Sequence, residues 1–115
     1  MTDSKRLALA KAVFPERDVA ENGLDGRTWI TTIDGAPSPW VPFDPANNSE
    51  QAIAVLLWLH TIGEIEICRY CVGVSTFVVY PYNDVPAISI PHDGTSAGLR
   101  QAVTDAALMV ARVKL

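Results

Sequence analysis

The chain has few cysteines, histidines and basic residues, and the scarcity of each argues against a particular class of structure or function. Two cysteines in 115 residues cannot build a disulfide framework, so we expect a reducing compartment. Nine Lys and Arg residues lie scattered among thirteen Asp and Glu residues, and the net charge of −4 argues against a nucleic-acid partner. Two histidines leave little material for acid–base catalysis.

Long apolar runs are absent as well. No stretch reaches the roughly 18 to 20 apolar residues that a membrane-spanning helix needs. Near the N-terminus, Lys11 interrupts the short run that a signal peptide would keep intact. With 49% hydrophobic and 19% charged residues, the composition suits one ordinary core. We therefore expect a single soluble domain over 1–115, with no membrane partner.

The most informative stretch that is present is a helix predicted between Asn48 and Gly63. Asn48, or the serine after it, can accept a hydrogen bond from an unpaired N–H at the helix start, and Gly63 is a typical stop. Apolar residues cover more than a third of the circumference and continue onto the polar side at Ile53 and Leu57. The helix therefore needs cover from several directions, and its leftover apolar residues predict a homo-oligomer.

The N-terminal half predicts a short helix, a strand and a proline-rich arm. The helix ends before Pro15, because the residue preceding a proline avoids helical angles. Segment 16–26 is polar, and 27–33 predicts a strand because it is rich in β-branched and aromatic residues. Asp-Gly at 34–35 has hairpin-turn chemistry. The prolines between 37 and 45 have no backbone N–H to donate to a neighbouring strand, so this arm should be an edge strand or an extended loop.

The C-terminal half predicts three strands, at 64–72, 76–82 and 87–90, and a helix over 96–113 with one apolar stripe. The connections between the strands are short, which favours antiparallel pairing. Strand 76–82 is apolar on both faces, which indicates cover on both sides. The sequence therefore predicts an α+β domain with an antiparallel sheet of about four to five strands between helices, in α-β-α layers.

The best candidate site is the loop that precedes the last helix. Small residues there expose backbone N–H groups at the positive end of a helix dipole, and hydroxyls lie beside them, as a phosphate or carboxylate would require. The alternative is an ordinary turn followed by an ordinary helix cap. The candidate ligand-binding residues are His92, Gly94, Thr95, Ser96 and Arg100, with Tyr80, Tyr82 and Trp40 to stack a base or dock a partner.

A second motif, Cys68-Arg69-Tyr70-Cys71, has the spacing of a zinc or redox pair, and His60 and His92 could complete four zinc ligands. Zinc pairs occupy tight turns, whereas this one lies within a strand pattern, where the two thiols point to opposite faces. No helix start is placed to activate a thiol. We expect no metal and no cofactor.

No nucleophile elbow and no recognisable pair of carboxylates indicates catalysis. His92 next to Asp93 could serve as a base and its orienting group, but neighbouring loop residues seldom point the same way. An enzyme is neither excluded nor positively indicated.

The order of the predicted elements along nearly the whole chain is typical of a known protein family. A short helix and a Trp-containing strand precede the central helix, and a strand hairpin and a small-residue loop follow it. The residues of the pattern are Phe43, Asp44, Pro45, Ala52, Val55, Trp58, Leu59, Ala102, Ala106, Ala107 and Leu108. This pattern resembles the small bacteriophage proteins of the phage ABA sandwich domain family. The resemblance implies α-β-α layering and a phage accessory protein in the host bacterial cytoplasm, and it offers no catalytic residues to carry over.

These observations give one leading hypothesis and two alternatives. The leading one is an accessory protein that binds and sequesters a host target, most concretely a small phosphorylated or nucleotide ligand of host defence signalling. The first alternative is a protein–protein inhibitor or structural adaptor that binds a host protein through the 37–45 loop and Trp40. The second is a small nucleotide hydrolase with His92 as its base.

Overall fold

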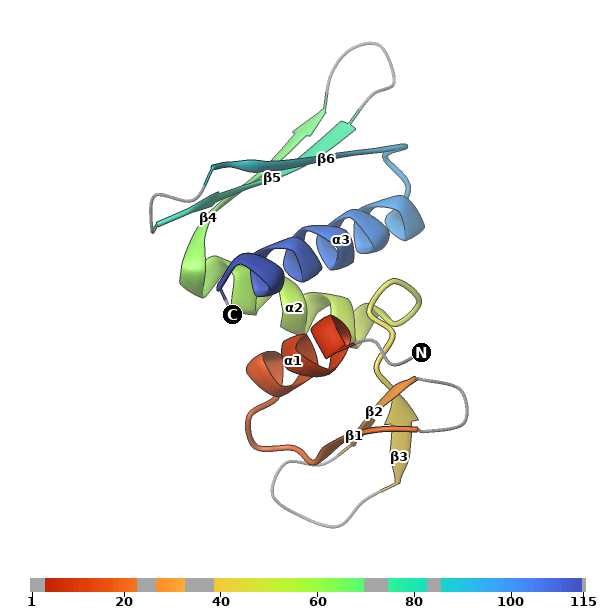
Figure 1. Ribbon diagram of the computed structural model, residues 1–115. Helices are drawn as coiled ribbons and strands as arrows, with labels where there is room; N and C mark the ends of the chain where they lie inside the picture. The colour runs from red at the N-terminus through yellow and green to blue at the C-terminus, as the bar shows by residue number, and fades with distance from the viewer. Residues whose placement is uncertain (1–3, 23–26, 33–38, 70–74, 83–85, 115) are drawn as a thin grey trace.

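The computed structural model describes residues 4–22, 27–32, 39–69, 75–82 and 86–114, which form three helices and six strands (Figure 1). None of the helices in these ranges is both long and apolar enough to cross a lipid bilayer. In chain order the elements are α1 (Ser4–Val13), β1 (Val19–Glu21), β2 (Thr28–Thr31), β3 (Trp40–Pro42), α2 (Ser49–Ile62), β4 (Gly63–Arg69), β5 (Ser75–Pro81), β6 (Ile88–His92) and α3 (Ser96–Lys114).

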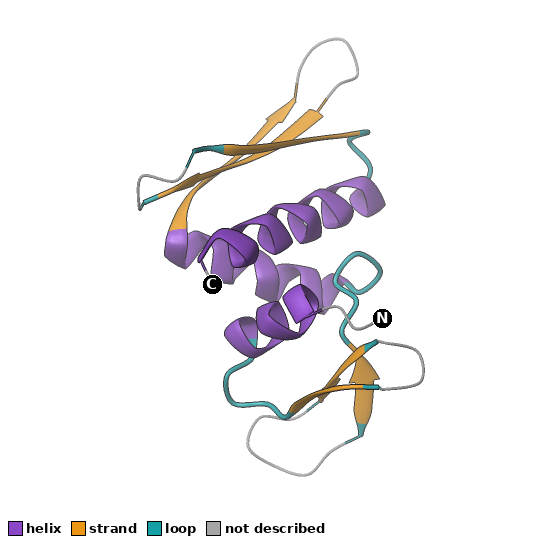
Figure 2. Cartoon of the chain, viewed as in Figure 1, coloured by secondary structure: helices purple, strands orange, loops and turns teal. Residues whose placement is uncertain are grey.

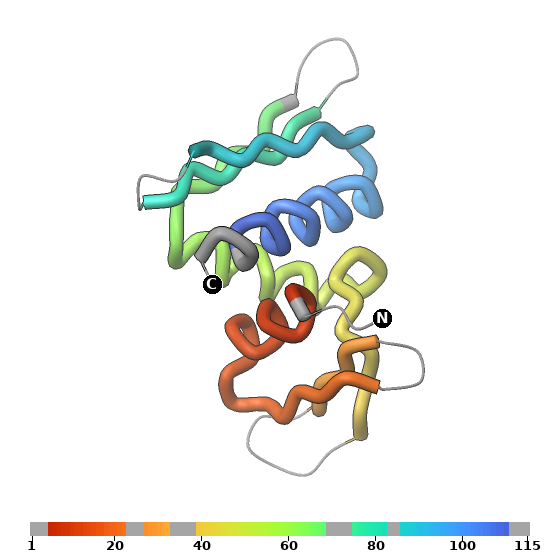
Figure 3. Tube along the Cα trace, in the orientation of Figure 1, coloured from red at the N-terminus to blue at the C-terminus, as the bar shows by residue number. Residues whose placement is uncertain are grey.

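The helices form the middle of the molecule, and a sheet lies on either side of them (Figure 2). Each sheet has three antiparallel strands, in the orders β1-β2-β3 and β4-β5-β6. Figure 3 shows that the strands before α2 all enter one sheet and those after it all enter the other. The predicted α+β class and antiparallel pairing are confirmed. The strands, however, form two separate sheets around the helices and not one sheet of four to five strands between helical layers.

The sheet β4-β5-β6 has helices on one face only (Figure 1). Phe77 and Val79 are buried on the helical side, whereas Glu66 and Tyr80 are exposed on the other. Val78 lies on the open face between Glu66 and Ser89 in the strand register, yet it is only 9% exposed. Neighbouring strands therefore account for the two-sided apolar pattern of β5, and the predicted cover on both faces is not found among the described elements.

One continuous apolar core joins the three layers. It runs from Ile30 on β2, through Val55 and Leu59 on α2, to Phe77 on β5. Helix α3 contributes a row of small residues, including Ala102 and Ala106, which let α1, α2 and the β4-β5-β6 sheet pack closely against it. Helix α2 packs against α1, α3 and β4, which cover it from several directions but leave Ile53 and Leu57 exposed.

The start of α2 follows local sequence chemistry, whereas its end is fixed by a tertiary contact. Asn48 is the N-cap, and its side-chain oxygen accepts a hydrogen bond from the Gln51 N–H at 3.0 Å. Gly63 ends the helix, as predicted, but its backbone is extended and not left-handed. The glycine is needed for close approach, since a Cβ there would lie 2.6 Å from the Tyr80 carbonyl oxygen and 2.9 Å from the Pro81 Cα.

The smaller sheet contains one strand that the sequence pattern did not reveal. β1 lies within the polar 16–26 segment and pairs with β2, which is the central strand. The Asp18 N–H also donates to the Thr31 hydroxyl at 3.1 Å. β3 is an edge strand, as its prolines predict, and the expected turn at 34–35 lies outside the described residues.

The contact at Gly63 makes a stability prediction. Gly63→Ala should lower the free energy of unfolding by about 1 to 3 kcal/mol, because the added methyl group meets the β5 backbone, which cannot move without breaking the β4–β5 ladder. Urea denaturation of the variant would measure this. Ser89→Ala, at an exposed position of the same sheet, is the control and should change stability by less than about 0.5 kcal/mol. A Gly63→Ala variant as stable as the wild type would contradict the close approach.

Candidate functional site

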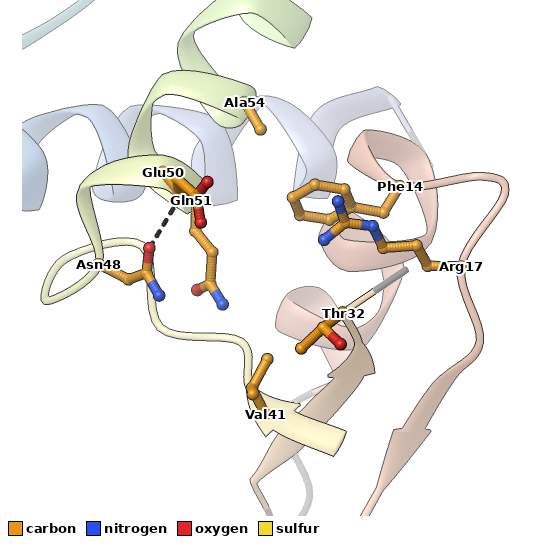
Figure 4. Close-up of a pocket in the computed structure, with 8 residues that line it drawn as sticks. All are labelled: Phe14, Arg17, Thr32, Val41, Asn48, Glu50, Gln51 and Ala54. Carbon is orange, nitrogen blue, oxygen red and sulfur yellow. Dashed lines mark hydrogen bonds between the residues drawn. The ribbon is translucent and has the colours of Figure 1, made fainter. Parts of the chain in front are cut away.

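A pocket of about 310 Å³ lies where α1 ends, where β2 and β3 approach each other, and where α2 begins (Figure 4). Phe14 and Arg17 form one wall, and the first two turns of α2 form the opposite wall (Figure 4). Its volume is at the small end of the range for ligand sites. The lining residues are Phe14, Arg17, Thr32, Val41, Asn48, Glu50, Gln51 and Ala54.

Gln51 fixes the α2 wall. Its side chain is 4% exposed and has two partners on the segment that leads into the helix. The carbonyl oxygen accepts from the Asp44 N–H at 2.6 Å, and the amide nitrogen donates to the Pro42 carbonyl at 2.8 Å. Both ends of the amide are therefore satisfied, which is what a buried glutamine requires. Gln51 thereby holds β3, the following loop and α2 in one arrangement.

The opposite wall is held by aromatic contacts. The Arg17 guanidinium lies over the Phe14 ring, 4.5 Å from its centroid, and the Phe14 and Phe43 rings meet edge to face at 6.2 Å. Pro15 stops α1, and the Arg17 N–H donates to the Phe14 carbonyl at 3.2 Å, which brings Arg17 back over the helix end. The Arg17 guanidinium is thus positioned over the Phe14 ring, which in turn packs against Phe43.

The charges in the pocket have opposite signs on opposite walls. Arg17 supplies a permanent cation on one side, and Glu50 supplies a carboxylate on the other (Figure 4). Asn48 and Thr32 add polar groups, and Phe14, Val41 and Ala54 add apolar surface. Among the lining residues that the structure describes there is no imidazole and no thiol. The arrangement is suited to holding a small polar molecule by its charged groups.

In the loop predicted to bind an anion, Asp93 and Thr95 make hydrogen bonds within the loop itself. Asp93 Oδ1 accepts from the Thr95 N–H at 2.9 Å and from the Thr95 hydroxyl at 2.6 Å. The Thr95 hydroxyl oxygen in turn accepts from the Gly98 N–H at 3.0 Å and so caps α3. The Thr95 hydroxyl, followed by its backbone N–H, lowers the pKa of Asp93. The alternative of a turn followed by a helix cap therefore describes this geometry, with a carboxylate of the chain itself at the helix start.

Three other predicted residues of this region, His92, Gly94 and Arg100, also make hydrogen bonds within the protein, although His92 Nε2 is buried without a partner among the described residues. The Gly94 N–H donates to His92 Nδ1 at 3.1 Å, and Gly94 has the positive φ of 82° that suits a glycine. A Cβ on Gly98 would collide with the Asp93 carboxylate, so the capping turn accounts for a glycine at that place. Ser96 begins α3 and is exposed. Arg100 Nε donates to the Ala46 carbonyl at 3.1 Å and so ties α3 to the loop before α2.

The predicted stacking residues lie away from this loop. His92 pairs with Ser75 in the strand register, and Tyr80 is five residues farther along β5, roughly 17 Å away. The Tyr80 and Tyr82 hydroxyls donate to Glu66 at 3.3 Å and to Glu64 at 3.2 Å. Partial desolvation of the exposed Tyr82 ring, followed by the Glu64 hydrogen bond, raises the pKa of Tyr82. The third stacking residue, Trp40, is exposed on β3 in the other sheet. The eight predicted residues thus occupy three separate regions.

Cys68, the first residue of the expected zinc or redox pair, is half-buried on β4. Its thiol donates to Glu66 Oε1 at 2.9 Å, and Cys71 lies outside the described residues. No group of three or more His, Cys, Asp or Glu side chains within the described ranges is placed to hold a metal ion.

The pocket residues were missed at the sequence level because they come from four separate elements. One local signal was available: Phe14-Pro15 predicts a helix stop, and an arginine two residues after such a stop can fold back over the aromatic ring. Asn48 was recognised, but only as a helix cap. Nothing in the spacing of the chain indicates that β3 and the end of α1 meet at that cap.

The Gln51 amide provides a pH-dependent test of the α2 wall. Gln51→Glu keeps the acceptor for the Asp44 N–H but replaces the donor to Pro42 with an oxygen, so it should cost about 1 to 3 kcal/mol at pH 7. Burial against a carbonyl raises the pKa of the introduced carboxyl, which can donate again once protonated. The loss relative to wild type should therefore shrink as the pH falls in urea titrations. An equal loss at all pH values would contradict this geometry.

The Thr95 hydroxyl makes a second prediction. The pKa of Asp93 is below its ordinary value of 3.8, so its carboxylate stabilises the fold above that value, and the contribution is lost as the pH falls through the lowered pKa. Thr95→Ala should raise the pKa of Asp93 in an NMR titration and, by removing the cap, cost about 1 kcal/mol. Thr95→Ser keeps the hydroxyl and should change neither. An unchanged Asp93 pKa in Thr95→Ala would rule out the hydroxyl as its main cause.

Comparison with known proteins identifies no relative. No protein-family model, no curated protein and no solved structure matches the chain significantly. The resemblance to the phage ABA sandwich domain family therefore stays a prediction from the sequence pattern.

Proposed function

We propose that the protein is a non-enzymatic binding protein that holds a small molecule bearing an anionic group in the pocket of Figure 4. The observation that carries the proposal is the Arg17 guanidinium, positioned over Phe14 at the pocket wall. A guanidinium is always charged near neutral pH, and its planar set of donors matches phosphate and carboxylate groups.

Three further properties support a binding role. The pocket is concave and mixes apolar surface with a few polar groups, as ligand sites do. Its walls are held by the Gln51 hydrogen bonds and by the contact between Phe14 and Phe43. Few protein side chains would therefore have to become ordered on binding, which lowers the entropy cost of binding a ligand. Glu50, on the wall opposite Arg17, would orient a hydrogen-bond donor or a cationic group of the same ligand.

The size of the pocket restricts the class of ligand. A volume of about 310 Å³ suits a compact phosphorylated metabolite or a single nucleotide and not a cyclic oligonucleotide. In this proposal the protein sequesters the ligand unchanged, in the role of phage accessory protein that the sequence resemblance suggests. The site differs from the one predicted from the sequence, where the Asp93 carboxylate already occupies the helix start.

A thermal-shift screen tests the proposal directly. The purified protein would be screened with inorganic phosphate, sugar phosphates, nucleoside monophosphates and carboxylates. A ligand at a hundredfold excess over its dissociation constant stabilises the folded state by about 2.7 kcal/mol, which is a shift of several degrees for a domain of this size. Recovery of the unchanged compound after denaturation would support sequestration, and recovery of a product would contradict it.

Two variants locate the site by calorimetric titration with the compound that the screen selects. Arg17→Gln should weaken binding at least about tenfold, because it removes the cation at the pocket wall. Ala54→Leu should also weaken binding, by filling the pocket from α2 with a residue that suits a helix. Arg27→Gln makes the same chemical change at an exposed residue outside the lining set and should bind normally. No shift with any compound, or equal affinity in Arg17→Gln and Arg27→Gln, would refute the proposal.

A further inference from the structure

Helix α2 carries one exposed stripe on a circumference that is otherwise mostly buried. Ile53 and Leu57 lie on this stripe and are 58% and 62% exposed, although both are large and apolar. Glu50 precedes them and His60 follows them, and both are exposed as well. The four positions are separated by three, four and three residues, which is the spacing of the contact seam between two packed helices.

The stripe is complementary to itself when it is reversed. If a second α2 lies antiparallel to the first, with the two-fold axis at the level of Val55, Ile53 meets Leu57 of the second copy, and the reciprocal pair forms as well. In the same register Glu50 meets His60 of the second copy at both ends of the seam. An apolar centre is then flanked by two pairs in which a carboxylate faces an imidazole.

We propose that the protein forms a two-fold symmetric homodimer through antiparallel pairing of α2 with α2 of a second copy. A two-fold interface uses the same patch on both subunits, which is what the reversed register provides. Antiparallel packing also sets the helix dipoles in opposite directions. A parallel pair in register would instead place Glu50 against Glu50 and His60 against His60, so like groups would face each other.

The surroundings of the stripe suit a second helix. The seam from Glu50 to His60 is about 15 Å long at the rise of an α-helix. Ala54 and Thr61 flank it on one side and are short enough to let two helices approach to the usual 8 to 10 Å between axes. One helix face is smaller than the roughly 800 Å² per partner of a standard stable interface. The dimer should therefore be weak and depend on concentration.

The first experiment measures the dimer and its apolar centre. Sedimentation velocity over a wide range of concentrations should show a monomer–dimer equilibrium for the full chain. Leu57→Gln should raise the dissociation constant at least about tenfold, because it removes the leucine from both Ile53–Leu57 pairs at the centre of the dimer. Met109→Gln makes a similar change at a residue that is 47% exposed on α3 and should leave the constant unchanged. Circular dichroism would confirm that both variants are folded.

The second experiment tests the charge pairing. His60→Lys places a permanent cation opposite Glu50 of the second copy and should lower the dissociation constant several-fold. His60→Glu places two carboxylates together and should raise it by a similar factor. Both substitutions lie at the same exposed position near the C-terminal end of α2, so exposure and helix position are matched between them.

The third experiment fixes the direction of pairing in a background where Cys68 and Cys71 are replaced by serine. A mixture of the Glu50→Cys and His60→Cys proteins should form a disulfide-linked heterodimer on mild oxidation, and neither protein alone should cross-link, because identical positions are about 15 Å apart along the antiparallel seam. A monomer at every concentration, a dimer insensitive to Leu57→Gln, equal effects of the two His60 variants, or self-linking of either cysteine variant would each overturn the proposal.

Discussion

The constraint on which the structure depends is the burial of α2. The helix is apolar around most of its circumference, and a single sheet face can cover only part of it. The fold meets this requirement by packing α1 and α3 against α2 and moving both sheets to the outside of the helices (Figure 2). Gly63 lets the chain pass directly from the helix into β4. Any other residue at this position would place its Cβ against the β5 backbone.

The elements with strong local signals were predictable. The cap at Asn48, the helix end at Gly63 and the proline-limited edge strand lie where the sequence places them. Helix α3 covers the predicted range, but its stripe follows the periodicity only in part: Met109, which the helical period places on the stripe, is exposed, and Thr104, which it places off the stripe, is buried. The layer order was not predictable. Strands before and after α2 have the same local sequence pattern whether they join one sheet or two. Only tertiary packing determines which of these arrangements forms. β1 was missed because its residues have no strand periodicity, and Val78 suggested a second cover that neighbouring strands supply.

The candidate sites also differ in how far the sequence could predict them. The 93–98 loop has the composition of an anion site, but the Asp93 carboxylate and the Thr95 hydroxyl satisfy that chemistry within the chain. The pocket has weaker sequence signals, yet its geometry places a cation, a carboxylate and apolar surface around one cavity. Its two walls come from residues more than thirty positions apart, so no local motif could have marked it. Glu50 connects the two inferences, since it lines the pocket and also lies at one end of the exposed α2 stripe.

The measurement that tests the central claim most directly is a map of amide chemical-shift changes in ¹⁵N-labelled protein titrated with inorganic phosphate and a nucleoside monophosphate. A ligand held by the Arg17 wall predicts shifts that saturate together at Phe14, Arg17, Thr32 and Asn48, with little change from Asp93 to Gly98. Shifts confined to the loop before α3 would return the site to the one that the sequence suggested. The absence of saturable shifts in the pocket would contradict a binding function for it.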